Sequence, residues 1–206
     1  MMEESQPKHL FDNLDEFNQK VTASKGKVVV LVHPFYNLST GSKRETVKLG
    51  DYTKHITLLA LKSKTPVVIF EDDKFLSNTF KKFGRNVFFI QTSRIARSYD
   101  TRAGSLHGSG SEVVPIPKEG WPKAHDAFTN AKVKDILIGG MYAYSGVLNE
   151  KDARLSREKD LNYKSKKSVA YGCVGGAYIE FAANPKYNRV RVIPNALYPF
   201  NPMKPD

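Results

Sequence analysis

The sequence predicts an α/β fold with an open, mostly parallel sheet of five to six strands and helices on both faces, a Rossmann-like three-layer arrangement. Short apolar runs rich in β-branched residues alternate along the chain with stretches of helical spacing, as in βαβ units. The apolar runs are continuous, which is typical of strands buried on both faces. With 206 residues, 40% of them hydrophobic, the chain is long enough for one full core and short for two. We therefore expect a single α/β domain over residues 1–206.

The predicted strands are short apolar runs that end in polar residues, glycine or proline. The first of them, Lys27–Val32, is almost entirely valine and leucine, and it stops at His33-Pro34 because proline removes a backbone donor. The other four predicted strands are Pro66–Phe70, Asn86–Ile90, Val133–Ile138 and Arg189–Ile193, and Val113-Val114 could add a short sixth strand.

Helices are predicted before and between these strands, because hydrophobic residues recur there at i, i+3, i+4 and i+7. The predicted helices are Met1–Ser24, Asp51–Lys64, Lys74–Phe83, Trp121–Ala131 and a stretch from Cys173 to Ala183.

Three segments do not fit the alternating pattern. Residues 93–118 are basic, rich in glycine and poor in apolar residues, and loops of this length are usually functional or disordered, so we expect a mobile basic loop. Residues 145–167 form a highly charged excursion, and the proline-rich tail 198–206 should be extended. The tail could pack across a neighbouring surface or a second subunit, so a homo-oligomer is considered.

Composition limits the cellular setting and the partners. The single cysteine excludes an internal disulfide framework, and no apolar run approaches the length of a membrane span. The N-terminus lacks the basic-then-apolar pattern of a signal peptide, so we expect a cytoplasmic protein without membrane contact. The net charge of +11 suits an anionic substrate or partner. Nucleic acid is not favoured as the partner, because no recognised binding motif accompanies the basic clusters.

The carboxyl ends of the predicted strands are where a site is expected, because ligands of parallel sheets bind outside those ends. The polar residues and glycines found there come from separate parts of the chain. They are His33, Glu71 with Asp72, Gln91 with Thr92, Gly139 with Gly140, and Asn195. We take Gln91, Gly139, Gly140, Asn195, Arg94 and Arg97 as candidate substrate-binding residues.

Each of these candidates also has a structural interpretation. His33 could be a base, since imidazole titrates near neutral pH, or a strand-end side chain satisfied by the backbone. Asp72 could act as an acid, a base or a metal ligand, or it could cap a helix. Gly139 and Gly140 could present amides to an oxyanion or form a tight turn. The histidines show no metal-ligand spacing and no phosphate-cradling glycine pattern follows the first strand, so no metal or cofactor is expected.

Cys173 is the strongest candidate for chemistry. It is the only cysteine, three glycines flank it, and it lies at the first turn of a predicted helix. Free N–H groups and the positive dipole end favour a thiolate there, as in cysteine nucleophiles. The alternative is that Cys173 is a small buried residue, because free cysteine is among the most buried residue types.

Residues Val114 to Pro199 resemble the isochorismatase-like cysteine hydrolases. The matching motifs are Pro117–Trp121 with Phe128, Ile136–Gly140, Gly172-Cys173-Val174, and Val190–Ala196. The resemblance implies a doubly wound α/β fold and hydrolysis of an amide or related bond in a small molecule. It also implies that Cys173 is the nucleophile and Lys118 the matching lysine. Where the family has an aspartate after the first strand this chain has His33, and Met141–Tyr171 is inserted before the cysteine.

Three hypotheses of function follow. The first is a small-molecule hydrolase with Cys173 as nucleophile, His33 as base, and Lys118 as electrostatic support. The second is a non-catalytic binding module for an anionic ligand or nucleic acid, and the third is a structural or assembly protein.

Overall fold

The sheet has six parallel strands, as expected for an open α/β fold. The structure, a computed structural model, describes residues 8–34, 46–71, 85–92, 117–141 and 172–198. The strands are β1 (Lys8–His9), β2 (Lys27–Val32), β3 (Val67–Glu71), β4 (Val87–Gln91), β5 (Asp135–Met141) and β6 (Arg189–Tyr198). Every neighbouring pair is parallel, and the order across the sheet is β1-β4-β3-β2-β5-β6.

The strand order makes the sheet doubly wound. From the central strand β2 the chain adds β3 and then β4 on one side, and it later adds β5 and β6 on the other. In register, Val29 of β2 faces Val67 of β3 on one side and Leu137 of β5 on the other. The order therefore reverses at β2, which is where ligands bind in open sheets of this kind.

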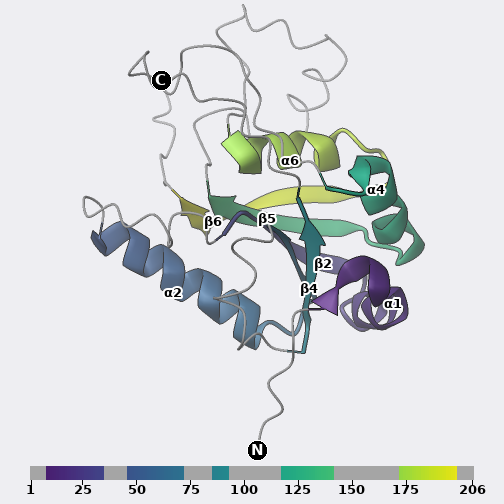
Figure 1. The fold of residues 1–206 in the computed structure, drawn as a ribbon, viewed down its shortest axis with the longest axis horizontal. Helices are drawn as coiled ribbons and strands as arrows, with labels where there is room; N and C mark the ends of the chain where they lie inside the picture. Colours follow the sequence, from purple (N-terminus) through teal and green to yellow (C-terminus); the bar gives the residue numbers. More distant parts are fainter. Residues whose placement is uncertain (1–7, 35–45, 72–84, 93–116, 142–171, 199–206) are drawn as a thin grey trace, which may run out of the picture.

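Helices cover both faces of the sheet (Figure 1). The helices are α1 (Leu14–Ala23), α2 (Thr46–Lys62), α4 (Gly120–Asn130) and α6 (Gly172–Ala182), and Leu10–Asp12 forms a 3₁₀ turn. Helices α1, α4 and α6 share a core cluster with Val28, Val30 and Val32, whereas α2 packs with Val29 and Leu31. This division follows from the alternation of side chains along β2, which places successive valines on opposite faces.

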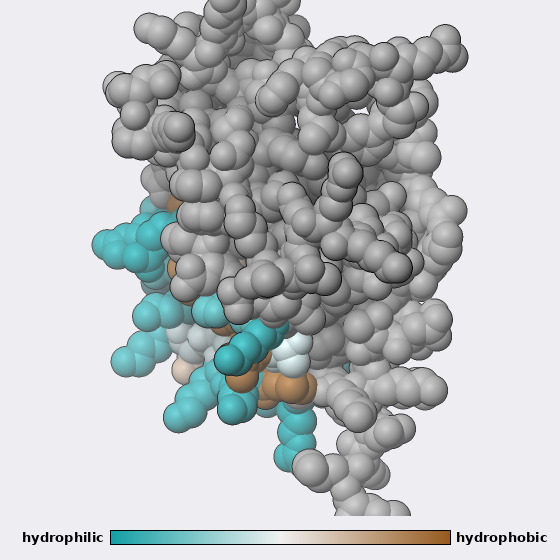
Figure 2. Space-filling view, turned by 90° about the vertical axis from the view of Figure 1, so that its left-hand side faces the viewer, coloured by the Kyte–Doolittle hydropathy of each residue, from teal (hydrophilic) through white to brown (hydrophobic). Residues whose placement is uncertain are grey.

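Helix α2 leaves two leucines, Leu58 and Leu61, exposed to solvent next to Lys54 and Lys62. Figure 2 shows the side of the molecule that carries α2, where hydrophobic surface lies in small areas among hydrophilic side chains. Isolated apolar side chains on a surface are normal. No described helix combines the length and the apolar character that crossing a membrane requires.

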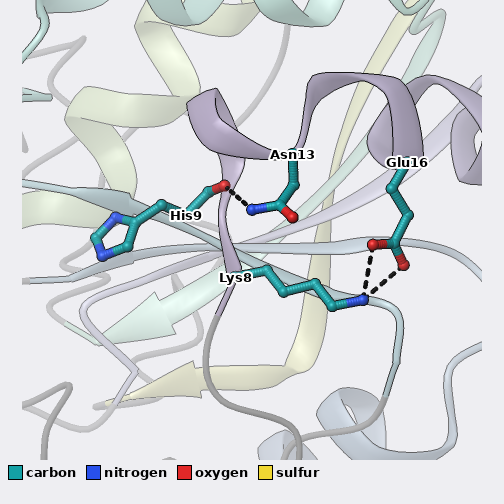
Figure 3. A network of polar contacts seen from close by, with 4 residues as sticks. All are labelled: Lys8, His9, Asn13 and Glu16. Carbon is teal, nitrogen blue, oxygen red and sulfur yellow. Dashed lines mark hydrogen bonds and ion pairs between the residues drawn. The ribbon is translucent and has the colours of Figure 1, made fainter.

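The N-terminal segment differs from the prediction of one helix over Met1–Ser24. Lys8-His9 instead forms an edge strand paired with Phe88 and Phe89, and the α-helix starts only at Leu14. Nζ of Lys8 donates to both carboxylate oxygens of Glu16, at 2.6 and 2.7 Å, and Nδ2 of Asn13 donates to the His9 carbonyl at 2.8 Å (Figure 3). A two-residue polar strand carries no periodic signal, so only its pairing with β4 reveals it.

Strands β5 and β6 both run past their predicted ends. Gly139 and Gly140 lie inside β5, and β6 continues through Pro194, which an edge strand tolerates. A Cβ on Gly139 would lie 2.7 Å from Cβ of Ala196 in β6, and one on Gly140, whose φ is 137°, would overlap the Val32 carbonyl. These glycines therefore let β5 approach its two neighbours closely, instead of ending the strand.

Several predicted segments lie outside the described residues. They are the helix Lys74–Phe83, the short strand Val113-Val114, most of the basic loop 93–118, the excursion 145–167, and the tail after Tyr198.

Candidate functional site

Residues from four separate segments meet near the carboxyl ends of the strands. His33 follows β2, Glu71 ends β3, Gln91 and Thr92 close β4, and Cys173 begins α6. Because all strands run in one direction and α6 leads from the end of β5 to the start of β6, these residues share one edge of the sheet. Of the residues expected at a site, Cys173, His33 and Gln91 therefore lie at the same edge of the sheet.

Cys173 is buried at the start of α6, with only 3% of its surface exposed. Burial raises the pKa of its thiol to about 12, and the negative charge of Glu71 adds to the rise. A hydrogen bond to the backbone at Cys173 lowers the pKa, but by less than these two effects raise it. The expectation that the helix start favours a thiolate is therefore wrong in its net direction, because burial and the charge of Glu71 together raise the pKa by more than the backbone hydrogen bond lowers it.

Among the described residues, Glu71 is the buried carboxylate at this edge, and its exposed fraction is zero. The sequence predicts both Glu71 and Asp72 at a strand end and favours Asp72 for chemistry, but Asp72 lies outside the described residues. The sequence contained a signal for Glu71, because it is a glutamate at the last position of an otherwise apolar strand. Burying an ionised carboxylate is costly without a specific environment, so such a residue indicates a functional site. Glu71 lies close enough to Cys173 for its charge to act on the thiol.

His33 is held in an unusual backbone conformation. Its φ is 44°, in the left-handed region that few residues other than glycine adopt. Its N–H donates to the Phe70 carbonyl at 2.8 Å, and its Nε2 lies 3.1 Å from Oγ1 of Thr92. Strained residues of this kind cluster at active sites and ligand clamps, where the surrounding structure must hold them.

Lys118 reaches the same edge through its backbone. Its N–H donates to the Gln91 carbonyl at 2.9 Å, and the preceding Pro117 forms an antiparallel bridge with Thr92. The Lys118 side chain is exposed. The lysine named by the family resemblance is thus anchored beside the end of β4, where its charge faces solvent.

The other predicted substrate-binding residues occupy different positions. Gly139 and Gly140 are buried inside β5 and serve strand packing, and their role toward an oxyanion stays a prediction. Asn195 lies within β6, three residues before the strand ends at Tyr198. Arg94 and Arg97 lie outside the described residues.

A second polar cluster, which the sequence did not indicate, lies between α4 and α6 near the amino end of β6. Nδ1 of His125 is 2.8 Å from the hydroxyl of Tyr187, and its Nε2 is 4.0 Å from Oε2 of Glu180. Burial, with Asp126 nearby, raises the pKa of Tyr187 above its ordinary value. His125 and Tyr187 are 62 residues apart, so no local pattern could have paired them.

Within the described part of the chain, His, Cys, Asp and Glu side chains nowhere gather in threes as metal ligands would. Cys173, Glu71 and His33 lie at the same edge of the sheet, but they do not form a group of metal ligands.

Comparison with protein-family models, with curated proteins and with solved structures finds no match to this chain.

Proposed function

We propose that this protein is a small-molecule hydrolase in which Cys173 is the nucleophile and Glu71 accepts the thiol proton. The observation that carries the proposal is a buried thiol and a buried carboxylate at the carboxyl edge of a doubly wound sheet, close enough for the charge of Glu71 to raise the pKa of Cys173. Perturbed titratable groups in such a position are typical of functional sites. The resemblance to isochorismatase-like hydrolases implies the same class of reaction.

The raised pKa of Cys173 is compatible with this role if Glu71, whose charge reaches the thiol, takes its proton as the reaction proceeds. Because the pKa of Cys173 is raised to about 12, the sulfur keeps its proton at neutral pH, and we take Glu71 as the acceptor of that proton during the reaction. As Sγ attacks the carbonyl carbon of the substrate, the thiol proton passes to Glu71. The protonated Glu71 then donates that proton to the leaving nitrogen, and the acyl group stays on sulfur.

Water completes the reaction. It attacks the thioester carbon and gives one proton to Glu71, and that proton passes to the departing sulfur to regenerate the thiol. The carboxylate that the family places after its first strand would thus be supplied here by the neighbouring strand β3, with His33 in the original position.

The substrate we propose is small and anionic. Lys118 carries an exposed ammonium group at the edge of the site, and the chain has a net charge of +11, so negative molecules would be drawn toward it. We assign Lys118 to this electrostatic role.

Acyl transfer to sulfur gives a direct test that does not require the natural substrate. The protein is incubated with p-nitrophenyl acetate and with a panel of small amides, and peptide mass spectrometry locates any acyl group. Because Cys173 is the only cysteine, a thioester can form at one position only. We expect acetylated Cys173, turnover of at least one amide, and loss of both in Cys173→Ser.

The matched control is Asp135→Asn, which removes a carboxylate at the opposite, amino end of β5. This variant should keep both activities. A wild-type protein that forms no acyl adduct and hydrolyses no member of the panel would contradict the proposal.

A non-catalytic binding module is the second candidate, and the 3% exposure of Cys173 favours it. In that case Cys173→Ala should leave the binding of anionic ligands unchanged and wild-type protein should show no turnover.

A further inference from the structure

We infer that Thr92 is a positioning residue of the carboxyl-edge site, which orients the His33 ring through its hydroxyl and ties it to Glu71 through its backbone. The inference rests on the proposed function, because it concerns the same site, but its central measurement does not depend on catalysis.

Thr92 is a polar residue that the fold buries. Within the described residues, Glu71 and Thr92 are the buried polar or charged side chains, and Thr92 is 2% exposed. A buried hydroxyl needs a hydrogen-bond partner, and the one found here is Nε2 of His33 at 3.1 Å. These two residues are 59 positions apart in the sequence, so the contact belongs to the tertiary structure.

The backbone of Thr92 joins three parts of the site. Its N–H donates to the Glu71 carbonyl at 2.9 Å, which continues the ladder between β3 and β4 beyond the last residue of β4. Its bridge with Pro117 holds the segment that carries Lys118. Thr92 thus has a fixed position relative to both proposed site residues, Glu71 and Lys118.

His33 needs such a partner because its backbone is strained. A non-glycine residue in the left-handed region is strained and persists only where its surroundings hold it. The N–H of His33 is held by Phe70 of β3, and its ring is held by Thr92 at the end of β4. The first contact holds the backbone at His33, and the second contributes to the orientation of the imidazole ring.

The experiment compares Thr92→Val, which removes the hydroxyl but keeps the branched shape, with Thr92→Ser, which restores the hydroxyl. The ring nitrogen signals of His33 are followed by ¹⁵N NMR and assigned through their loss in His33→Gln. We expect Thr92→Val to shift these signals and to average the two tautomers, and Thr92→Ser to return them toward the wild-type values.

Kinetics give the second measurement. Partners that orient a metal-bound histidine are typically worth about tenfold to a hundredfold in activity, and we take this range as the expectation for His33, which the sequence predicts as a base of the site. We expect kcat for the amide identified in the panel to fall by about that factor in Thr92→Val with little change in KM. Thr92→Ser should recover most of the rate. Thr92→Ala serves as a second hydroxyl-free variant if Thr92→Val does not fold.

Tyr187→Phe is the matched control, since it removes a hydroxyl from the other histidine pair, at His125. It should change the His125 signals and leave the His33 signals and kcat unchanged. Unshifted His33 signals in folded Thr92→Val, or hydrolysis by that variant at the wild-type rate, would overturn the inference. If no variant hydrolyses anything, the proposed function fails, while the His33 signals still decide whether Thr92 positions the ring.

Discussion

His33 and His125 each place a ring nitrogen next to a buried hydroxyl group, at 3.1 Å from Thr92 and 2.8 Å from Tyr187, but their surroundings differ. His33 stands at a strand end with a strained backbone, on the same sheet edge as Glu71 and Cys173. His125 stands in the regular helix α4 and packs against aromatic rings of α6 and of the segment that precedes β6.

The aromatic surroundings of His125 indicate a structural role. Its ring centroid lies 5.6 Å from that of Trp121 and 5.7 Å from those of Phe181 and Tyr187. Such contacts hold α4 against α6, and the hydrogen bond to Tyr187 satisfies polar groups that packing has buried. A contact between an imidazole and a hydroxyl group therefore stabilises a helix interface at His125. In our proposal, the same kind of contact orients the ring of His33 at the carboxyl-edge site.

The largest expected effect is a difference in turnover between variants of the two carboxylates, Glu71 near His33 and Glu180 near His125. Glu71→Gln should lower turnover by about 10²- to 10⁴-fold, the usual contribution of a positioned acid–base group, because glutamine cannot take the thiol proton. Glu180→Gln, beside His125, should leave turnover within about twofold of wild type. The measurement is kcat/KM for the amide identified in the panel. Equal losses in both variants would remove the distinction between the clusters.

For the free energy of unfolding, we expect the larger loss in the cluster around His125 and the smaller loss near His33. Phe181 contacts the rings of Phe70, Trp121, His125, Phe128 and Tyr187. Phe181→Ala should therefore cost about 3 to 5 kcal/mol of unfolding free energy, the usual cost of removing a buried aromatic ring. Urea unfolding followed by fluorescence measures it, with Thr92→Val as the comparison expected to lose less. A cost below about 1 kcal/mol would show that the aromatic cluster does not hold the helices together.

A smaller difference between the two clusters is expected in how the free energy of unfolding changes at alkaline pH. The pKa of Cys173 is raised in the folded protein from 9.0 to about 12, so the unfolded chain loses this proton at lower pH than the native protein does. The buried thiol therefore contributes stability below about pH 9, and that contribution falls by about 1.4 kcal/mol per pH unit as pH rises toward 12. Cys173→Ala should lack this decline.

Tyr187 provides the comparison within the same titration. Its pKa is also raised, from a higher ordinary value of 10.0, so its contribution should begin to decline about one pH unit later. Tyr187→Phe should remove only that later decline. Unfolding free energies measured from about pH 8 to pH 11 test both variants. An identical pH dependence of Cys173→Ala and wild type would show that the thiol is not protonated more strongly in the folded state.

Local patterns in the sequence determined much of the fold. The continuous apolar runs from Lys27, Val67 and Val87 became central or near-central strands, because their side chains are hydrophobic on both faces. The helical spacing after Cys173 likewise became α6, with Val174, Ala177 and Phe181 buried. The positions of His33, Gln91 and Thr92 at strand ends followed from the strands themselves.

Only the tertiary structure decided which of these residues act on one another. Strand order, the edge strand Lys8-His9, and the pairs His33–Thr92 and His125–Tyr187 depend on contacts between segments far apart in the sequence. The pKa of Cys173 differs from the prediction for the same reason. A helix start can be found from local spacing, but burial and the charge of Glu71 arise when β3 and α6 pack together. Local periodicity determines which side chains are buried, and only packing determines which neighbours they are buried against.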